Sequence, residues 1–278
     1  MNISLVYMVA GLSSRFGGNI KQFAKVGSKG ETLIEYSLKQ ALPAGFTKII
    51  FIVGEKTRKP FEETFKKKYK GIPVEYALQE FDRAERDKPW GTVDALCAAS
   101  DIIQEPFIVC NGDDLYGTTT FAILIDFLKN NTENATVGYT LEEVLPEEGK
   151  VNRGIFQLEN GYVKKIKEYF DIEKNNLQEK KIDENDKASM NIFALQRNVL
   201  PLLQKSLDNF KKENENDRKK ECLLPNELSQ LIQKNKIIMK MLSTPDRCIG
   251  ITNPGDEEIV RKLLENQENP QCTTHLSV

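Results

Sequence analysis

A short apolar run at the N-terminus breaks abruptly into a loop rich in glycine and hydroxyl groups. Residues 3–9 are too few and too β-branched for a helix of their own, which predicts a buried strand. Residues 10–18 then bring glycines, serines and Arg15, and Lys21 follows. Because glycines let backbone N–H groups approach an anion and cations add charge, the stretch is typical of a phosphate-binding loop. An ordinary turn that needs its glycines only for geometry fits this stretch alone equally well.

Strands and helices alternate through the first half of the chain. Apolar spacing predicts strands over 48–53, 73–78 and 106–110, and helices over 31–42, 61–69, 93–100 and 118–129. This alternation indicates an α/β fold, a Rossmann-like three-layer sandwich with a mostly parallel, mixed sheet. Ligands of such sheets bind beyond the carboxyl ends of the strands. The loop after the first strand and residues 111–114 should therefore face one crevice, which favours the phosphate-binding interpretation.

The second half of the chain has a different pattern. It predicts strands over 135–141, 154–158, 162–167, 188–195 and 237–242, and helices over 199–210, 225–234 and 256–265. Asn160-Gly161 is a hairpin signal between two of these strands. Because no linker rich in proline, glycine and serine divides the halves, we expect a single domain over residues 1–270. The polar stretches 171–187 and 211–221 are interpreted as solvated loops or helix ends.

Composition excludes several classes of function. A net charge of −2 provides no overall field for nucleic acid or an anionic membrane, so local cations must meet any anionic ligand. No segment approaches the roughly 20 apolar residues of a membrane span, and the N-terminal run lacks the features of a secretion signal. The five cysteines are scattered, which is typical of reduced thiols in a cytoplasmic protein. The single histidine, His275, excludes a histidine-based triad or a histidine-rich metal site.

Two adjacent carboxylates, Asp113 and Asp114, follow the strand predicted over 106–110. Neighbouring carboxylates repel each other unless a cation or hydrogen bonds offset their charges. Mg²⁺ usually takes one or two protein carboxylates and completes its shell with water and substrate phosphates. We therefore predict that Asp113 holds Mg²⁺, whereas Asp114 is as readily a cap for the turn before Thr118.

Further polar residues lie at other predicted strand ends. The amide of Gln79 can read a base edge with one donor and one acceptor, and Gly91, before Thr92, lets the backbone approach a ring. Glu168 and Asn191 can bind hydroxyl groups of a second substrate. Taken singly, Gln79 is more often an ordinary surface polar residue, and Glu168 and Asn191 are as readily ordinary polar residues as binding residues.

In order and spacing, these residues resemble the sugar-phosphate nucleotidylyltransferases of the NTP-transferase superfamily. The similarity is greatest to a bacterial subgroup of uncharacterised nucleotidyltransferases, and it extends over roughly residues 3 to 262. The motifs that carry it are Gly11–Arg15, Lys21, Gln79, Lys88–Thr92, Asn111–Gly117, Gly154, Glu168, Ser189–Asn191 and Gly250–Asn253.

The resemblance implies a GT-A-like nucleotidyltransferase fold and a Mg²⁺-dependent reaction. An NTP, here UTP or dTTP, would react with a sugar-1-phosphate to give an NDP-sugar and pyrophosphate. It also implies a nucleotide-binding half over 1–130, a sugar-phosphate-binding half over 131–254 and a closing helix over 255–270. The implied contacts are Ala10 and Gly11 with the nucleotide, Arg15 with the β- and γ-phosphates, Lys21 with the α-phosphate, Gln79, Gly91 and Thr92 with a pyrimidine nucleotide, Asp113 with Mg²⁺, and Gly154, Glu168 and Asn191 with the sugar phosphate.

The sequence departs from the family pattern at three places. Asp94 replaces a histidine that is frequent after Gly-Thr, and Tyr169 replaces the lysine after the sugar-binding glutamate. A second metal ligand has no clear counterpart, although Thr252 and Asn253 lie near its expected position. Two alternatives stay open: a GT-A glycosyltransferase that uses a nucleotide-sugar donor, and a non-catalytic nucleotide-sensing protein of the same fold.

Overall fold

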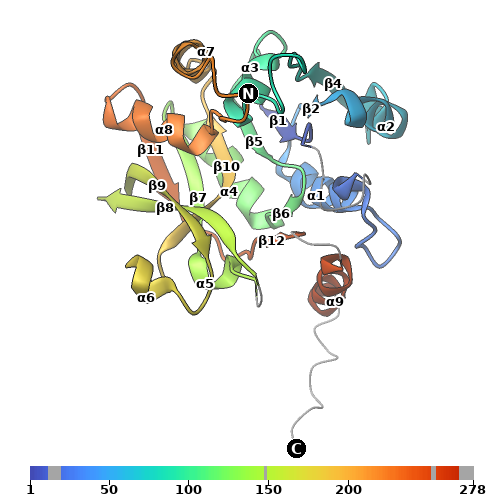
Figure 1. The fold of residues 1–278 in the computed structure, drawn as a ribbon. Helices are drawn as coiled ribbons and strands as arrows, with labels where there is room; N and C mark the ends of the chain where they lie inside the picture. The colour runs from blue at the N-terminus through green and yellow to red at the C-terminus, as the bar shows by residue number, and fades with distance from the viewer. Residues whose placement is uncertain (12–19, 147–148, 252–254, 269–278) are drawn as a thin grey trace, which may run out of the picture.

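A twisted central sheet runs through the molecule (Figure 1). The computed structural model describes residues 1–11, 20–146, 149–251 and 255–268. Within them, ten strands pair in the order β3-β4-β2-β1-β5-β10-β7-β11-β9-β8. Four strands from the first half are parallel to one another: β1 (Ser4–Met8), β2 (Lys48–Val53), β4 (Ile72–Leu78) and β5 (Phe107–Asn111).

The second half of the chain extends the same sheet with strands of mixed direction. β10 (Lys187–Leu195) lies between β5 and β7 (Asn134–Thr140) and is antiparallel to both. β11 (Met239–Leu242) is parallel to β7 and antiparallel to β9. β8 (Val151–Glu159) and β9 (Tyr162–Ile172) form the hairpin that Asn160-Gly161 predicts, and both turn residues have positive φ.

Helices cover both faces of the sheet, which confirms the three-layer α/β prediction (Figure 1). Alternate residues of β2 enter two different cores, because successive side chains of a strand point to opposite faces. One core lies under α1 (Leu33–Ala41), α2 (Glu55–Phe65) and α4 (Thr118–Asn130). The other lies under α3 (Thr92–Ala98), α7 (Val199–Glu213) and α8 (Leu224–Gln233).

A third, smaller core attaches the C-terminal helix α9 (Asp256–Glu268) to the first half of the chain. Val260 and Leu264 of this helix pack with Leu33 of α1 and with Leu115. Leu115 belongs to β6 (Asp114–Leu115), which pairs with β12 (Ile249–Gly250) in a separate two-stranded sheet. The helix predicted near the end of the chain is therefore present.

Several predicted boundaries were wrong. α2 begins at Glu55, not at residue 61, because the Gly54 N–H donates to Thr57 Oγ1 at 2.9 Å and starts the helix before Pro60. It ends at Phe65, and residues expected to be helical form β3 (Lys68–Tyr69). Both strands of the hairpin are longer than predicted. The short elements that were not predicted are η2 (Lys21–Phe23), η3 (Leu42–Ala44), β6, α5 (Leu141–Val144), α6 (Leu177–Lys180) and β12.

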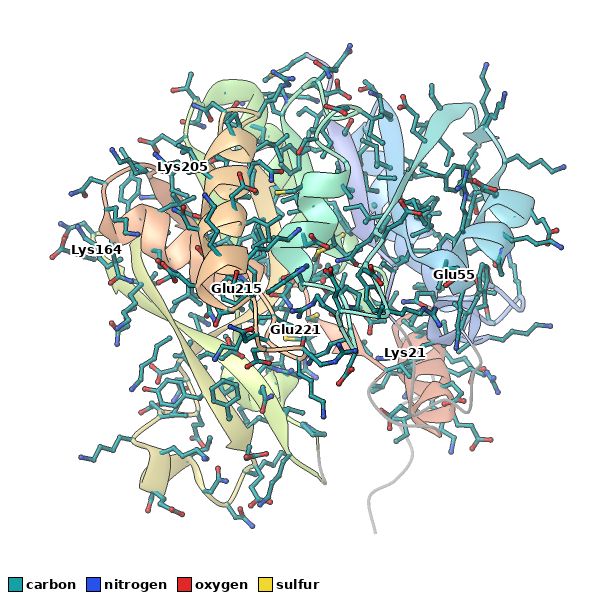
Figure 2. All side chains as sticks on the ribbon, turned by 45° about the horizontal axis from the view of Figure 1, so that its top comes forward. Lys21, Glu55, Lys164, Lys205, Glu215 and Glu221 are labelled. Atoms are coloured by element: carbon teal, nitrogen blue, oxygen red, sulfur yellow. The ribbon has the colours of Figure 1, made fainter. Side chains whose placement is uncertain are left out.

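Charged side chains of both signs are spread over the surface, as the labelled Glu55, Lys164, Lys205 and Glu215 illustrate (Figure 2). In the part of the chain that the structure describes, no helix is both long and apolar enough to cross a membrane. Four described cysteines are free thiols, and three of them are buried. Cys272 and His275 lie outside the described residues.

Candidate active site

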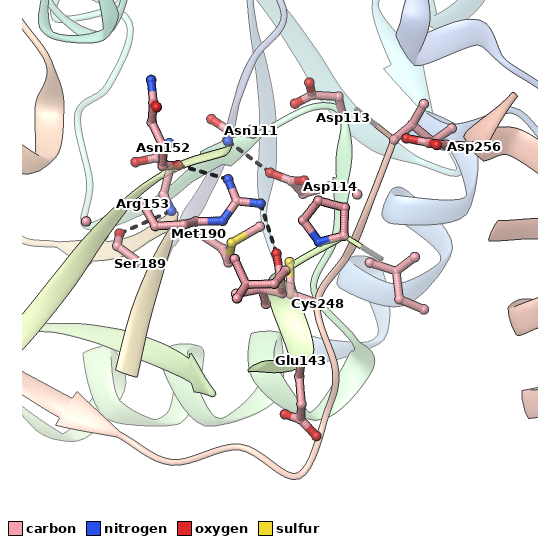
Figure 3. A pocket seen from close by; sticks show the side chains of 18 of the residues that line it. Asn111, Asp113, Asp114, Glu143, Asn152, Arg153, Ser189, Met190, Cys248 and Asp256 are labelled. Atoms are coloured by element: carbon pink, nitrogen blue, oxygen red, sulfur yellow. Dashed lines mark hydrogen bonds between the residues drawn. The ribbon is translucent and has the colours of Figure 1, made fainter. Parts of the chain in front are cut away.

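A cavity of about 880 Å³ opens beyond the carboxyl ends of β1 and β5. The first half contributes Lys21 after β1, Asn111 at the end of β5, and Asp113 and Asp114 just beyond it. The second half contributes residues of β8, β9 and β10, among them Arg153, Ser189 and Met190 (Figure 3). Apolar residues of α9 line it as well. Six of the predicted site residues lie in its wall: Lys21, Thr92, Asp113, Gly154, Glu168 and Asn191.

Lys21 and Asp113 form an ion pair in this cavity. The Lys21 ammonium donates to Asp113 Oδ2 at 2.8 Å, and the side chains are 14% and 31% exposed. Gly112, which precedes Asp113, packs closely on the end of β1, because a Cβ there would lie 2.3 Å from Cγ1 of Val9, the residue that follows β1. A cation and a carboxylate that remain partly accessible thus share one end of the cavity.

Asp114 has a different environment from its neighbour. It is buried, and its Oδ2 accepts a hydrogen bond from the Asn111 side-chain amide at 2.9 Å. Burial raises the pKa of Asp114 to about 6, with a further rise from Asp113 and an opposing effect of the Asn111 hydrogen bond. The other oxygen faces Gly250, where a Cβ would approach it to 2.4 Å.

The expectation that Asp114 caps the turn before Thr118 was wrong. Asp114 lies in β6, and the N-cap position of α4 is Gly117, which has no side-chain cap. Asp246 supplies the missing acceptor, because the Thr120 N–H donates to its Oδ2 at 2.7 Å. Local sequence could not reveal this cap, since its donor and acceptor lie 126 positions apart.

Gln79 and Gly91 lie together in a buried polar group. The Gln79 amide nitrogen donates to the Gly91 carbonyl at 3.0 Å and to Asp94 Oδ2 at 2.9 Å. The second Asp94 oxygen accepts from Lys211 at 2.7 Å. Because a carboxylate only accepts hydrogen bonds, Asp94 fixes which way the Gln79 amide is turned. Thr92, the residue after Gly91, lines the cavity. Gln79 and Gly91 are not among the described residues that line it.

The residues predicted to bind the sugar phosphate, Gly154, Glu168 and Asn191, lie on the neighbouring strands β8, β9 and β10. Gly154 pairs with Glu168 across the β8–β9 hairpin and with Ser189 of β10. Burial raises the pKa of Glu168, and the charge of Arg153 opposes that rise. Asn191 has a φ of 57°, in the left-handed region, where the register of β10 against β7 shifts. Such bulges turn side chains toward a site that regular pleating would not allow.

Other predicted residues have no place in the cavity wall. Ala10 and Gly11 end the first described segment and do not line the cavity, and a Cβ at Gly11 would meet no atom within 4 Å. Arg15, Thr252 and Asn253 lie outside the described residues. The sequence pointed to Asn111, Ser189 and Met190 only as parts of longer motifs and did not suggest Arg153 or the apolar wall of α9, all of which line the cavity.

The donors present suit a cation that is held only partly by protein. Within the described ranges, no group of three or more His, Cys, Asp or Glu side chains is close enough to enclose a metal ion. Asp113 presents one accessible carboxylate to the cavity, whereas Asp114 is tied by Asn111. This arrangement fits Mg²⁺, which takes few protein carboxylates and completes its shell with water and phosphates.

Comparison with known proteins agrees with this geometry. The sequence model of the family described as nucleotidyl transferase matches residues 18–225. A search of curated proteins found no significant sequence match.

Solved structures share the fold at low identity. A Bacillus anthracis protein assigned as a glucose-1-phosphate thymidylyltransferase is 15% identical, with a TM-score of 0.68 and 94% of each chain covered. The inositol-1-phosphate CTP transferase of T. maritima is 16% identical, with a TM-score of 0.66, and 95% of this chain and 97% of that chain are covered. A UTP-bound UGPase from Acinetobacter baumannii is 16% identical, with a TM-score of 0.65, and the covered shares are 98% and 95%. These likenesses confirm the expected nucleotidyltransferase fold.

Proposed function

Because the chain belongs to the nucleotidyl transferase family, we propose that it joins an NTP to a sugar-1-phosphate and releases pyrophosphate. The observation that carries the proposal is the shared cavity. Lys21 and Asp113, suited to a metal-bound triphosphate, line it together with Glu168 and Asn191, suited to a hydroxylated acceptor. Solved relatives with this fold include one bound to UTP and one bound to UDP-glucose.

The reaction is a single displacement at phosphorus. An oxygen of the acceptor phosphate attacks the α-phosphorus of the NTP and forms a new P–O bond. The bond from the α-phosphorus to the bridging oxygen breaks, and pyrophosphate leaves with that electron pair. Because the attacking oxygen is already anionic near neutral pH, the step needs no general base, in agreement with a chain whose single histidine is His275.

The residues of the cavity then act by alignment and charge neutralisation. Lys21 binds the α-phosphate, Arg15 binds the departing pyrophosphate, and Asp113 holds the divalent cation on which the family generally depends. When bound, Mg²⁺ neutralises charge on the triphosphate. The three donors of the Lys21 ammonium suit it to contact Asp113 and a phosphate oxygen at the same time.

Gln79 favours UTP or dTTP as the nucleotide. With its nitrogen held by Gly91 and Asp94, the amide has its oxygen as the acceptor for a base. Uracil and thymine present an N3–H donor, whereas N3 of cytosine is an acceptor. The fold alone does not favour one base, since the T. maritima relative is a CTP transferase.

Pyrophosphate release from each of the four NTPs, with and without a panel of sugar-1-phosphates, tests the proposal. We expect release that requires Mg²⁺, a sugar-1-phosphate, and UTP or dTTP. Consumption of a UDP-sugar without an NTP would instead indicate a glycosyltransferase. NTP binding without turnover would indicate a nucleotide sensor.

A further inference from the structure

Arg153 is the cation that the second half of the chain contributes to the cavity. Among the described residues that line it, only Lys21 and Arg153 carry positive charge, against the carboxylates of Asp113, Asp114, Glu143, Glu168 and Asp256. Lys21 is paired with Asp113, near the loop after β1. Arg153 lies on β8 directly before Gly154, on the acceptor side (Figure 3). The two cations therefore serve different parts of the cavity.

A β-bulge directs Arg153 toward the cavity. Val151 pairs with Ile172 and Arg153 pairs with Tyr169, so two residues of β9 oppose Asn152 alone. The second of these, Asp171, has a φ of 53°, and its N–H donates to Asn152 Oδ1 at 3.0 Å. Bulges locally break the alternation of a strand and re-aim its side chains. This one allows Arg153 to line the same cavity as Gly154, its neighbour in the strand.

The Arg153 guanidinium is fixed by main-chain carbonyl groups and not by acids. Nη1 donates to the Asn152 carbonyl at 3.0 Å, and Nη2 donates to the Val144 carbonyl at 3.1 Å. Across the described ranges, no carboxylate forms an ion pair with Arg153, although its charge opposes the rise that burial causes in the pKa of Asp114 and of Glu168. The positive charge of Arg153 is thus held in place without being neutralised by a carboxylate of the protein.

The Nε–H of Arg153 is buried and has no hydrogen-bond partner within the described structure. Because so deeply buried an atom is not reached from the cavity, the donors that remain for a ligand are the second N–H groups of Nη1 and Nη2, each of which makes one hydrogen bond to a carbonyl. With five N–H groups in a planar fork, Arg153 has donors left for two oxygens of one tetrahedral anion. Phosphate matches this geometry.

We propose that Arg153 binds the phosphate of the acceptor and holds it for attack on the NTP. The inference rests on the proposed function, because that function requires two phosphate sites in one cavity. Lys21 and Asp113 serve the triphosphate, and Arg153, next to Gly154 and Glu168, serves the acceptor. Its charge also reduces the repulsion between two anionic substrates.

Steady-state kinetics of Arg153→Ala, with UTP and glucose-1-phosphate as probes, tests the inference. We expect the KM for glucose-1-phosphate to rise about 10- to 100-fold, as expected for loss of a charged hydrogen-bonding partner, while the KM for UTP stays within about twofold. Arg153→Lys keeps the charge without the fork and should give an intermediate KM. Arg58→Ala, which removes a half-exposed arginine from α2, is the matched control and should match wild type.

Two kinetic results would overturn the inference: a rise in the KM for UTP in place of that for glucose-1-phosphate, or unchanged values for both. Thermal melts of each variant separate these outcomes from misfolding, and Arg153→Lys keeps the test valid if Arg153→Ala does not fold. If wild type releases no pyrophosphate with any sugar-1-phosphate, the proposed function fails separately. Calorimetry with glucose-1-phosphate then decides: binding that Arg153→Ala abolishes supports the site, and equal or absent binding refutes it.

Discussion

Lys21 and Asp113 are 92 positions apart in the sequence, and their 2.8 Å contact joins the ends of β1 and β5. If Lys21 stabilises charge at the α-phosphate, Lys21→Ala should reduce kcat about 10²–10³-fold, as loss of one preorganised donor does. Lys59→Ala is the matched control, because the Lys59 side chain is 84% exposed on α2. A Lys21→Ala enzyme with wild-type turnover would contradict this role.

Asp113 gives a second prediction, which concerns the metal. Asp113→Asn keeps the size of the side chain and removes the charge that would hold Mg²⁺. We expect turnover to be lost at every Mg²⁺ concentration, because one neutral amide is a poor ligand for a hard cation. Asp126→Asn, on the exposed face of α4, should leave the Mg²⁺ dependence unchanged. Full recovery of turnover by Asp113→Asn at high Mg²⁺ would show that Asp113 is only a minor ligand of the metal.

Asp94 gives a third prediction, which concerns the choice of base. In Asp94→Asn, the new amide can donate as well as accept, so only the Gly91 carbonyl still holds the Gln79 nitrogen, and Gln79 turns more readily to present that nitrogen to cytosine. The preference for UTP over CTP in kcat/KM should fall about fivefold to tenfold, the value of one net hydrogen bond. Lys211→Met keeps the Asp94–Gln79 contact and should preserve the preference. An unchanged ratio of kcat/KM for UTP to kcat/KM for CTP in Asp94→Asn would show that Asp94 has no part in the choice of base.

At this scale, the sequence predicts residues whose positions follow from strand ends. Lys21 and Asp113 were found because parallel strands end at one edge of a sheet. Arg153 was not found, because its orientation depends on an extra residue in the neighbouring strand, which periodicity does not reveal. The roles of Arg15, Gln79 and Gly91 stay predictions, since the described cavity wall does not include them.

Helix α1 carries a capping box that gives a prediction for a whole element. The Thr32 N–H donates to Glu35 Oε2 at 2.9 Å, and Thr32 Oγ1 accepts from the Glu35 N–H at 3.4 Å. Thr32→Ala should lower the free energy of unfolding by about 1 kcal/mol, the usual value of a lost N-cap. Denaturant titration measures this change, and Thr32→Ser should retain most of the stability. Equal midpoints for Thr32→Ala and wild type would show that the box contributes nothing.

The predicted helices and strands exist, and the errors in their boundaries and the short elements that were missed have local causes. The helix predicted from residue 61 begins at Glu55, where the Gly54–Thr57 contact starts α2. The two-residue strands β6 and β12 escaped detection because each is too short for a periodic pattern. Their pairing nevertheless positions Asp114 against Gly250.

For the whole molecule, alternating strands and helices predict the three layers but not the order of the sheet. β10 enters between β5 and β7 although it follows both in sequence, and this pairing depends on contacts between distant segments. The insertion positions Ser189 and Asn191 beside residues 111–114 in the cavity. Both halves of the chain thus meet in one site, which a transfer between two substrates requires.

The fate of an isotope label tests that transfer most directly. Purified protein is incubated with Mg²⁺, UTP and glucose-1-phosphate carrying ¹⁸O in its phosphate group, and the products are analysed by mass spectrometry. We predict a UDP-sugar that retains all the label and pyrophosphate that contains none, because the labelled oxygen forms the new bond at the α-phosphorus. UMP and pyrophosphate without a UDP-sugar, or no consumption of either UTP or dTTP with any sugar-1-phosphate, would contradict the proposed function.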